Sequence, residues 1–345
     1  MIQHGESTSI KRKDQLSYLN YLRFGSILLV ILLHCLSGFL TDPSFYPLRS
    51  YKLILLFNEI GRAGVPLFFM MSGYLLLNDP RTSDFSPFYK RRLSRILIPL
   101  CIWNAVYCLH YQKDILTFIK ESLVEGCAYH LWFLYTLLGI YLLAPFLKMI
   151  VDYATRKQLW WLLILICFSG TLRPAFNMLT PLYVYLFPNL MEGYVGYFLL
   201  GYLLGTAPSG GKNDRWVALL AMGAGMGLGV FGNYLLSSSE NLSLPFNTGY
   251  SLNHYLLAGG IFLLARTFRW MERPYVRSVG KVLSALTFQI YFVHVLVLER
   301  IAALVPDAGP ILVILISFLI TTGISLLLSA VLYLVSCILK KLKRF

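Results

Sequence analysis

Arg23 and His34 interrupt an otherwise apolar stretch near the start of the chain. The stretch covers residues 18–40 and is long enough to cross the hydrocarbon core of a bilayer as one helix. Eleven residues separate the two side chains, which is close to three helical turns, so they share one face about 16 Å apart along the axis. Ionisable groups inside a membrane span are costly and usually face a protein or water-filled interior, which makes both residues functional candidates. Alternatively, Arg23 reaches the membrane interface and His34 is a hydrogen-bonded core histidine.

A second predicted span, residues 51–77, carries Arg62 and Ser72. Pro66 has no amide hydrogen and leaves the carbonyl of Arg62 without its helical donor, which predicts a kink beside a buried charge. Ser72 and Gly73 form a small surface that another helix or a ligand can approach closely. The structural alternatives are an ion pair for Arg62 and helix packing for Ser72.

Three arginines, Arg91, Arg92 and Arg95, gather where a third predicted span begins. Guanidinium groups bind phosphate oxygens through paired N–H donors, so the cluster is suited to a polyphosphate ligand. A cluster of this kind also occurs where arginines contact anionic lipid head groups at the end of a membrane span. The sequence permits both interpretations.

Two later spans carry polar residues toward their expected outer ends. His130 and Trp132 open one of them, where an aromatic belt at the interface is expected and where a tryptophan could stack on a sugar ring. His294 lies past the middle of another span and Glu299 follows it. Adjacent helical residues point in different directions, so Glu299 and its neighbour Arg300 each require a partner on another helix.

The composition places these residues in a polytopic helical membrane protein. Apolar residues make up 57% of the chain and charged residues 13%, with a mean hydropathy of +0.65, which excludes an ordinary soluble domain. The six cysteines contain no C-x-x-C pair, so neither a disulfide framework nor a metal site is expected.

The hydropathy predicts an all-α bundle of about ten membrane-spanning helices. The spans expected are residues 18–40, 51–77, 95–111, 129–150, 158–172, 190–205, 215–236, 250–268, 281–303 and 309–339. Most of the 30 lysines and arginines then fall on one side, which predicts that both termini are cytoplasmic and explains the net charge of +14 without a nucleic-acid partner. No loop is long enough for a separate domain, so residues 1–345 are expected to form a single membrane domain. Within this domain, residues 1–17 are expected to be a cytoplasmic N-terminal segment and residues 340–345 a cytoplasmic basic tail.

Five motifs in this order resemble the family-3 membrane O-acyltransferases, bacterial proteins that acylate cell-surface glycans. The motifs are YLNYLRFGSILLVILLHC with Arg23 and His34, GVPLFFMMSGYLL, KRRLSRILIP, HLWFLYTLLGIYLLAPFL and IYFVHVLVL. They extend over nearly the whole chain, and the fourth is most similar to the subgroup that contains the enterobacterial common antigen O-acetyltransferase. Asn20 stands where the first motif commonly has Asp.

The resemblance implies acyl transfer from cytoplasmic acetyl-CoA to a sugar hydroxyl of a surface or lipid-linked polysaccharide, in the bacterial inner membrane. His34 and Arg23 would be catalytic, with His34 acting as general base or as an acyl-accepting nucleophile. The arginine cluster and Ser72 would bind the donor. The remaining candidates would bind the acceptor; these are Arg62, His130, Trp132, His294 and Glu299.

Other functions remain compatible with the sequence. The same site could transfer succinyl or another acyl group. Buried Arg, His and Glu could instead line the pathway of a lipid-linked sugar transporter or flippase, although no internal repeat supports this. Buried charges could also serve packing alone. The sequence specifies neither the oligomeric state nor the need for a separate extracytoplasmic partner.

Overall fold

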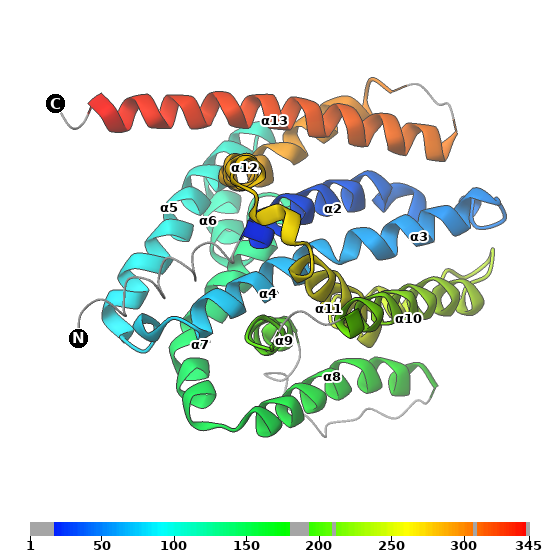
Figure 1. Cartoon of the computed structure of the whole chain (residues 1–345). Coiled ribbons are helices and arrows are strands. Elements are labelled where there is room, and N and C mark those ends of the chain that lie inside the picture. Colours follow the sequence, from blue (N-terminus) through cyan, green and yellow to red (C-terminus); the bar gives the residue numbers. More distant parts are fainter. Residues whose placement is uncertain (1–16, 180–192, 209–211, 306–308, 343–345) are drawn as a thin grey trace, which may run out of the picture. The chain divides into compact units, whose positions relative to one another are not determined.

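The computed structural model describes residues 17–179, 193–208, 212–305 and 309–342. Within these ranges the chain forms α-helices joined by short 3-10 helices and turns, and it forms no β-strand (Figure 1). The all-α fold class is therefore confirmed. Residues 1–16, most of the predicted cytoplasmic segment, lie outside the described ranges.

Each of the ten predicted spans coincides with a helix or a consecutive pair of helices. The helices are α2 (Ser17–Thr41), α3 (Ser50–Arg62), α4 (Gly64–Leu77), α5 (Phe85–His110), α6 (Ile115–Val124), α7 (Trp132–Tyr153), α8 (Arg156–Leu179), α9 (Val195–Gly205), α10 (Lys212–Leu236), α11 (Leu252–Arg266), α12 (Pro274–Ala302) and α13 (Pro310–Leu342). The amphipathic helix α6 was not expected from the sequence.

Helix length and hydropathy do not confirm the predicted number of spans. Seven helical segments among the described residues are long and apolar enough to cross a membrane, not ten. The three predicted spans outside this set fall on α8, α9 and α11. The 11 residues of α9 extend only about 16 Å, roughly half the hydrocarbon thickness. The count of ten is therefore not confirmed, and the cytoplasmic placement of both termini stays a prediction.

The helices divide between two compact units. The first contains the described residues of Met1–Phe68, Cys167–Phe187 and Ala207–Phe345, and the second those of Phe69–Ile166 and Pro188–Thr206. In the first unit, α2 packs against α3, α12 and α13, and α10 packs against α11. In the second unit, α5 packs against α6 and α7.

A break between α3 and α4 confirms the kink predicted beside Arg62. The first helix ends at Arg62 and the next begins at Gly64, so that Pro66 lies in a first helical turn, where proline is tolerated. A Cβ on Gly64 would lie 2.7 Å from the carbonyl oxygen of Ser26. Only glycine therefore permits this close approach of the break to α2.

In the second unit, the small surface around Gly73 is occupied by α9. A Cβ on Gly73 would overlap the carbonyl group of Phe198, and a Cβ on Gly201 would overlap that of Met70. The backbones of α4 and α9 are therefore in direct contact. The packing alternative is confirmed for Gly73, while the predicted donor contact of Ser72, which is half-buried, stays a prediction.

Candidate functional site

The imidazole rings of His34 and His294 stack on one another in the first unit. His34 comes from α2 and His294 from α12, and the ring centroids are 5.4 Å apart with 26° between the planes. His294 is completely buried and His34 is half-buried. The structure thus brings together two candidates that lie 260 positions apart in the sequence.

The backbone of α12 fixes the tautomer of His294. Its Nδ1 lies 2.7 Å from the carbonyl oxygen of Tyr291 and 3.2 Å from that of Ile290. A carbonyl oxygen only accepts hydrogen bonds, so Nδ1 carries a proton and donates it. In the neutral ring, Nε2 is therefore the nitrogen with the lone pair.

Arg23, like His34, contacts α12. Its Nη1 donates a 2.6 Å hydrogen bond to Oγ of Ser284, ten residues before His294 in α12. Both side chains are half-buried. The prediction that Arg23 and His34 share a face of the first span is therefore confirmed, and the face lies against α12.

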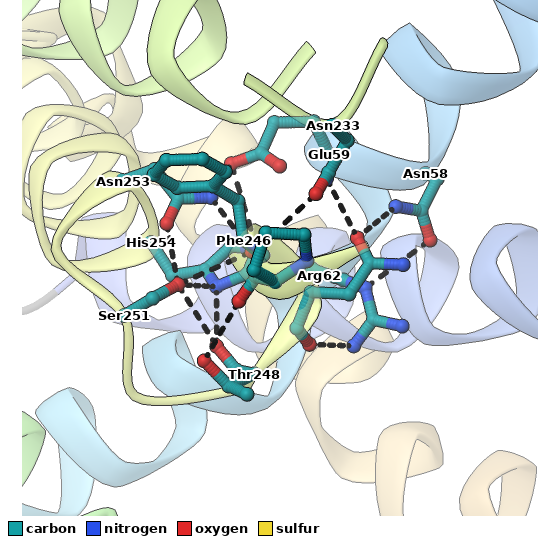
Figure 2. A network of polar contacts seen from close by, with 11 residues as sticks. Asn58, Glu59, Arg62, Asn233, Phe246, Thr248, Ser251, Asn253 and His254 are labelled. Atoms are coloured by element: carbon teal, nitrogen blue, oxygen red, sulfur yellow. Dashed lines mark hydrogen bonds and ion pairs between the residues drawn. The ribbon is translucent and has the colours of Figure 1, made fainter. Parts of the chain in front are cut away.

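Arg62 lies at the end of α3, where two asparagines hold its guanidinium group (Figure 2). Its Nε donates to Oδ1 of Asn58 at 3.2 Å, and its Nη1 donates to the backbone carbonyl of Asn247 at 2.6 Å. The positive charge is close enough to His34 to interact electrostatically with the imidazole. Arg62 is therefore a third predicted residue in the same unit, within electrostatic range of His34.

The segment that supplies the carbonyl for Arg62 is itself fixed by side chains. Oδ1 of Asn247 accepts hydrogen bonds from Asn58 at 2.9 Å and from Asn233 of α10 at 3.2 Å. The backbone N–H of Phe246 donates to Oδ1 of Asn233 at 3.0 Å. These bonds tie the 3-10 helix Pro245–Asn247 to α3 and α10, and so hold the Arg62 acceptor in place.

A buried carboxylate lies one turn before Arg62. Glu59 is completely buried, as are the Asn253 and His254 side chains of α11 that contact it (Figure 2). Oε1 of Glu59 accepts a 2.7 Å hydrogen bond from Asn253 and lies 3.5 Å from Nε2 of His254. The other ring nitrogen, Nδ1 of His254, donates to the carbonyl of Thr248 at 3.0 Å. The network therefore fixes both the carboxylate and the end of the 245–251 segment.

Sequence reasoning missed this network. Gly229 of α10 packs directly against the Glu59 carboxylate, and a Cβ there would overlap it. The available signal was a pair of adjacent polar residues in each of two apolar helices, Asn58-Glu59 and Asn253-His254. Buried charges are retained only when they are paired and hydrogen-bonded, so each pair indicates a partner elsewhere in the fold.

The arginine cluster belongs to the second unit, near the start of α5. That helix begins at Phe85, ten residues before the predicted span, so the cluster lies within it. Arg91 and Arg92 are half-buried and Arg95 is exposed. At least one arginine of the cluster is therefore exposed on the surface of the second unit.

The carboxylate of Asp79 interacts electrostatically with Arg92 of this cluster. Asp79 accepts two hydrogen bonds from the Arg81 side chain, at 3.0 and 2.9 Å. These bonds, together with the positive charge of Arg92, hold the pKa of Asp79 below its usual value. The donor-binding role of the cluster stays a prediction.

The candidates expected at the outer interface occupy different environments. His130 is 2% exposed and packs edge-on against the ring of Tyr107 at 5.0 Å, inside the second unit. Trp132 is half-buried, with its ring 5.4 Å from that of Tyr194. Glu299 is half-buried on α12, five residues beyond His294. The acceptor-binding roles of these three residues stay predictions.

Comparison with family models gives one match, and it covers both compact units. The model for the acyltransferase 3 family, described as an acyltransferase domain, matches residues 16–330. The chain belongs to the acyltransferase 3 family. Searches among curated proteins and among solved structures find no match for this chain. Membership of the family makes the chain a membrane acyltransferase, while the resemblance to a common-antigen subgroup is not confirmed.

Proposed function

We propose that this protein transfers an acetyl group from cytoplasmic acetyl-CoA to a sugar hydroxyl of a surface or lipid-linked polysaccharide, across the bacterial inner membrane. The observation that carries the proposal is the stacked His34–His294 pair, with the Arg62 charge within electrostatic range of His34, in a chain of the acyltransferase 3 family. A base and a fixed positive charge are the two requirements of acyl transfer to an alcohol.

In this mechanism His34 accepts the proton of the acceptor hydroxyl as its oxygen attacks the thioester carbonyl. Negative charge develops on the carbonyl oxygen, and the guanidinium of Arg62 stabilises it. The carbon–sulfur bond then breaks, and the thiol of coenzyme A leaves with the proton that His34 returns. His294, with its Nδ1 hydrogen bonded to the backbone of α12, holds the His34 ring in position through the stacked contact.

Different residues are assigned to the two ends of the donor. Arg91, Arg92 and Arg95 are assigned to the phosphates of acetyl-CoA, because guanidinium groups bind phosphate oxygens through paired donors. Arg23, bonded to Ser284, is assigned to orienting the thioester end. No metal has a role in this mechanism. Binding of the acceptor glycan is assigned to Trp132, His130 and Glu299.

The proposal is tested with membranes that contain the protein, radiolabelled acetyl-CoA and bacterial surface polysaccharide. His34→Ala should lower transfer of label to the glycan by about 10²–10⁴-fold, the range for removal of a general base. Ser37→Ala is the matched control, because this exposed hydroxyl of the same helix donates only to the backbone carbonyl of His34. Full transfer by inserted His34→Ala protein would refute the assigned mechanism. If the glycan incorporates succinyl from labelled succinyl-CoA as fast as it incorporates acetyl, the assignment of acetyl-CoA as the donor would be replaced.

A further inference from the structure

A cavity of about 400 Å³ opens in the first unit beside the first half of α2. Its walls are contributed by α2, the start of α4, α10, α11 and the segment that follows α11. The lining residues are Tyr21, Leu22, Gly25, Ser26, Leu28, Leu29, Leu67, Met222, Ile261, Leu264, Ala265, Phe268 and Met271. A Cβ on Gly25 would meet nothing within 4 Å, so this glycine leaves part of the cavity open.

The cavity lies on a different face of α2 from the candidate active site. Leu22, Ser26 and Leu29 follow one another at helical spacing and line it together. Arg23 and His34 contact α12 instead, and α12 contributes no lining residue. The cavity is therefore separate from the residues assigned to acyl transfer.

The cavity walls are almost entirely apolar, so they suit an alkyl chain better than a polar ligand. Only Tyr21 and Ser26 among the lining side chains carry a polar group, and both groups already donate to backbone carbonyls at 2.6 Å, those of Val276 and Leu22 respectively. A pantetheine arm would bury its two amides here without matching partners, and such burial costs free energy. An acyl chain needs no polar partner and makes dispersion contacts with the apolar walls.

A basic segment continues directly from the cavity wall. Residues 266–277 contain four arginines and one acidic residue, Glu272. Arg269 follows the lining residue Phe268, Arg273 lies two positions after the lining residue Met271, and both arginines are exposed. The ring of Trp270 lies 5.9 Å from that of Tyr21, which keeps this segment against α2. The arginines are therefore placed to meet an anionic head group.

We propose that this cavity binds one acyl chain of an anionic phospholipid, whose phosphate lies against Arg269 and Arg273. The apolar walls select the alkyl chain and the basic segment selects the charge of the head group. The site would be occupied by a lipid of the membrane leaflet that the basic segment faces. This inference depends on the membrane location of the chain and is independent of the acyl-transfer mechanism.

The test uses the full-length protein in nanodiscs that contain a trace of phosphatidylglycerol with a diazirine in its acyl chain. After irradiation, mass spectrometry should locate the cross-links in the α2 and α11 peptides. Unlabelled phosphatidylglycerol should compete several times better than phosphatidylcholine. Arg269→Gln combined with Arg273→Gln should remove this preference. Labelling spread evenly over all apolar helices, or an equal effect of the two competitors, would overturn the proposal.

Gly25→Leu should fill the cavity and reduce cross-linking at α2 several-fold. Gly38→Leu is the matched control, because it places the same side chain on the same helix at an exposed site with nothing within 4 Å. Ile261→Trp fills the cavity from α11 and serves if Gly25→Leu fails to fold. Undiminished labelling in a folded filling variant would refute the site. Displacement of the lipid by acetyl-CoA would also refute it, because the cavity would then bind the donor.

Discussion

At the scale of single residues, the stacked histidines are the contact on which the proposed chemistry depends. Two imidazoles that lie far apart in the sequence stack on one another, one buried and one half-buried, and the backbone of α12 determines which nitrogen of His294 is protonated. Pairs of Phe, Tyr or Trp rings stabilise packing by about 0.5–1.5 kcal/mol, so a phenyl ring in place of one imidazole can keep a packing contact. Packing and chemistry can therefore be separated by changing the ring.

His294→Phe keeps an aromatic ring against His34 but removes the hydrogen bonds that fix its orientation. We expect kcat to fall about tenfold or more, equivalent to at least about 1.4 kcal/mol, with the KM for acetyl-CoA nearly unchanged. The measurement is steady-state transfer of labelled acetyl over a range of acetyl-CoA concentrations. If His294→Phe is fully active while His294→Ala is not, the pair serves packing alone.

Glu59 offers a second prediction at this scale. Its carboxylate is completely buried and its described partners are Asn253 and His254. Removing one partner of a buried pair costs up to about 3–5 kcal/mol, so Glu59→Gln should lower the Tm in detergent. Glu240→Gln, an exposed carboxylate in a loop, is the matched control and should leave the Tm unchanged. In Glu59→Gln/His254→Gln, the loss should be smaller than the sum of the two single losses.

At the scale of elements, local sequence patterns predicted what a single helix determines. Helical periodicity placed Arg23 and His34 on one face, and Pro66 predicted the break after Arg62. The start of α5 was predicted ten residues late, because hydropathy marks the apolar part of a helix while its polar first turns also form hydrogen bonds. The contacts of Glu59 with α11 were not predicted, since the neighbours of a helix are not encoded in its own periodicity.

The contact of α4 with α9 gives the prediction at this scale. Gly73→Ala must displace the backbone of Phe198, and overpacking of this kind typically costs about 1–3 kcal/mol. Gly139→Ala in α7 is the control within the same unit, because a Cβ there meets nothing within 4 Å. It should be neutral or stabilise by up to about 1 kcal/mol. Thermal unfolding in detergent measures both, and equal Tm values would contradict the close packing.

At the scale of the whole molecule, the residues to which we assign acyl transfer and donor binding are distributed over both compact units. The His34 site belongs to one unit and the arginine cluster to the other. Arg91→Gln, Arg92→Gln and Arg95→Gln together should raise the KM for acetyl-CoA at least tenfold and change kcat less, because lost phosphate contacts weaken binding before chemistry. Arg49→Gln, a change of the same type in the first unit, should leave this KM unchanged. Unchanged KM in the triple variant would leave the cluster as a topology signal.

The placement of the termini is the remaining prediction at this scale. The distribution of lysine and arginine predicts that both ends are cytoplasmic, which requires an even number of crossings. The seven candidates among the described residues would give an odd number, so the charge rule predicts a different set of crossings, to which α8, α9 or α11 could contribute. A reporter that is active only outside the cytoplasm is fused to each terminus in turn. The result distinguishes an even from an odd number of crossings. No reporter activity at either end supports the even count, whereas activity at one end alone would show an odd number of crossings and contradict the cytoplasmic placement of that terminus.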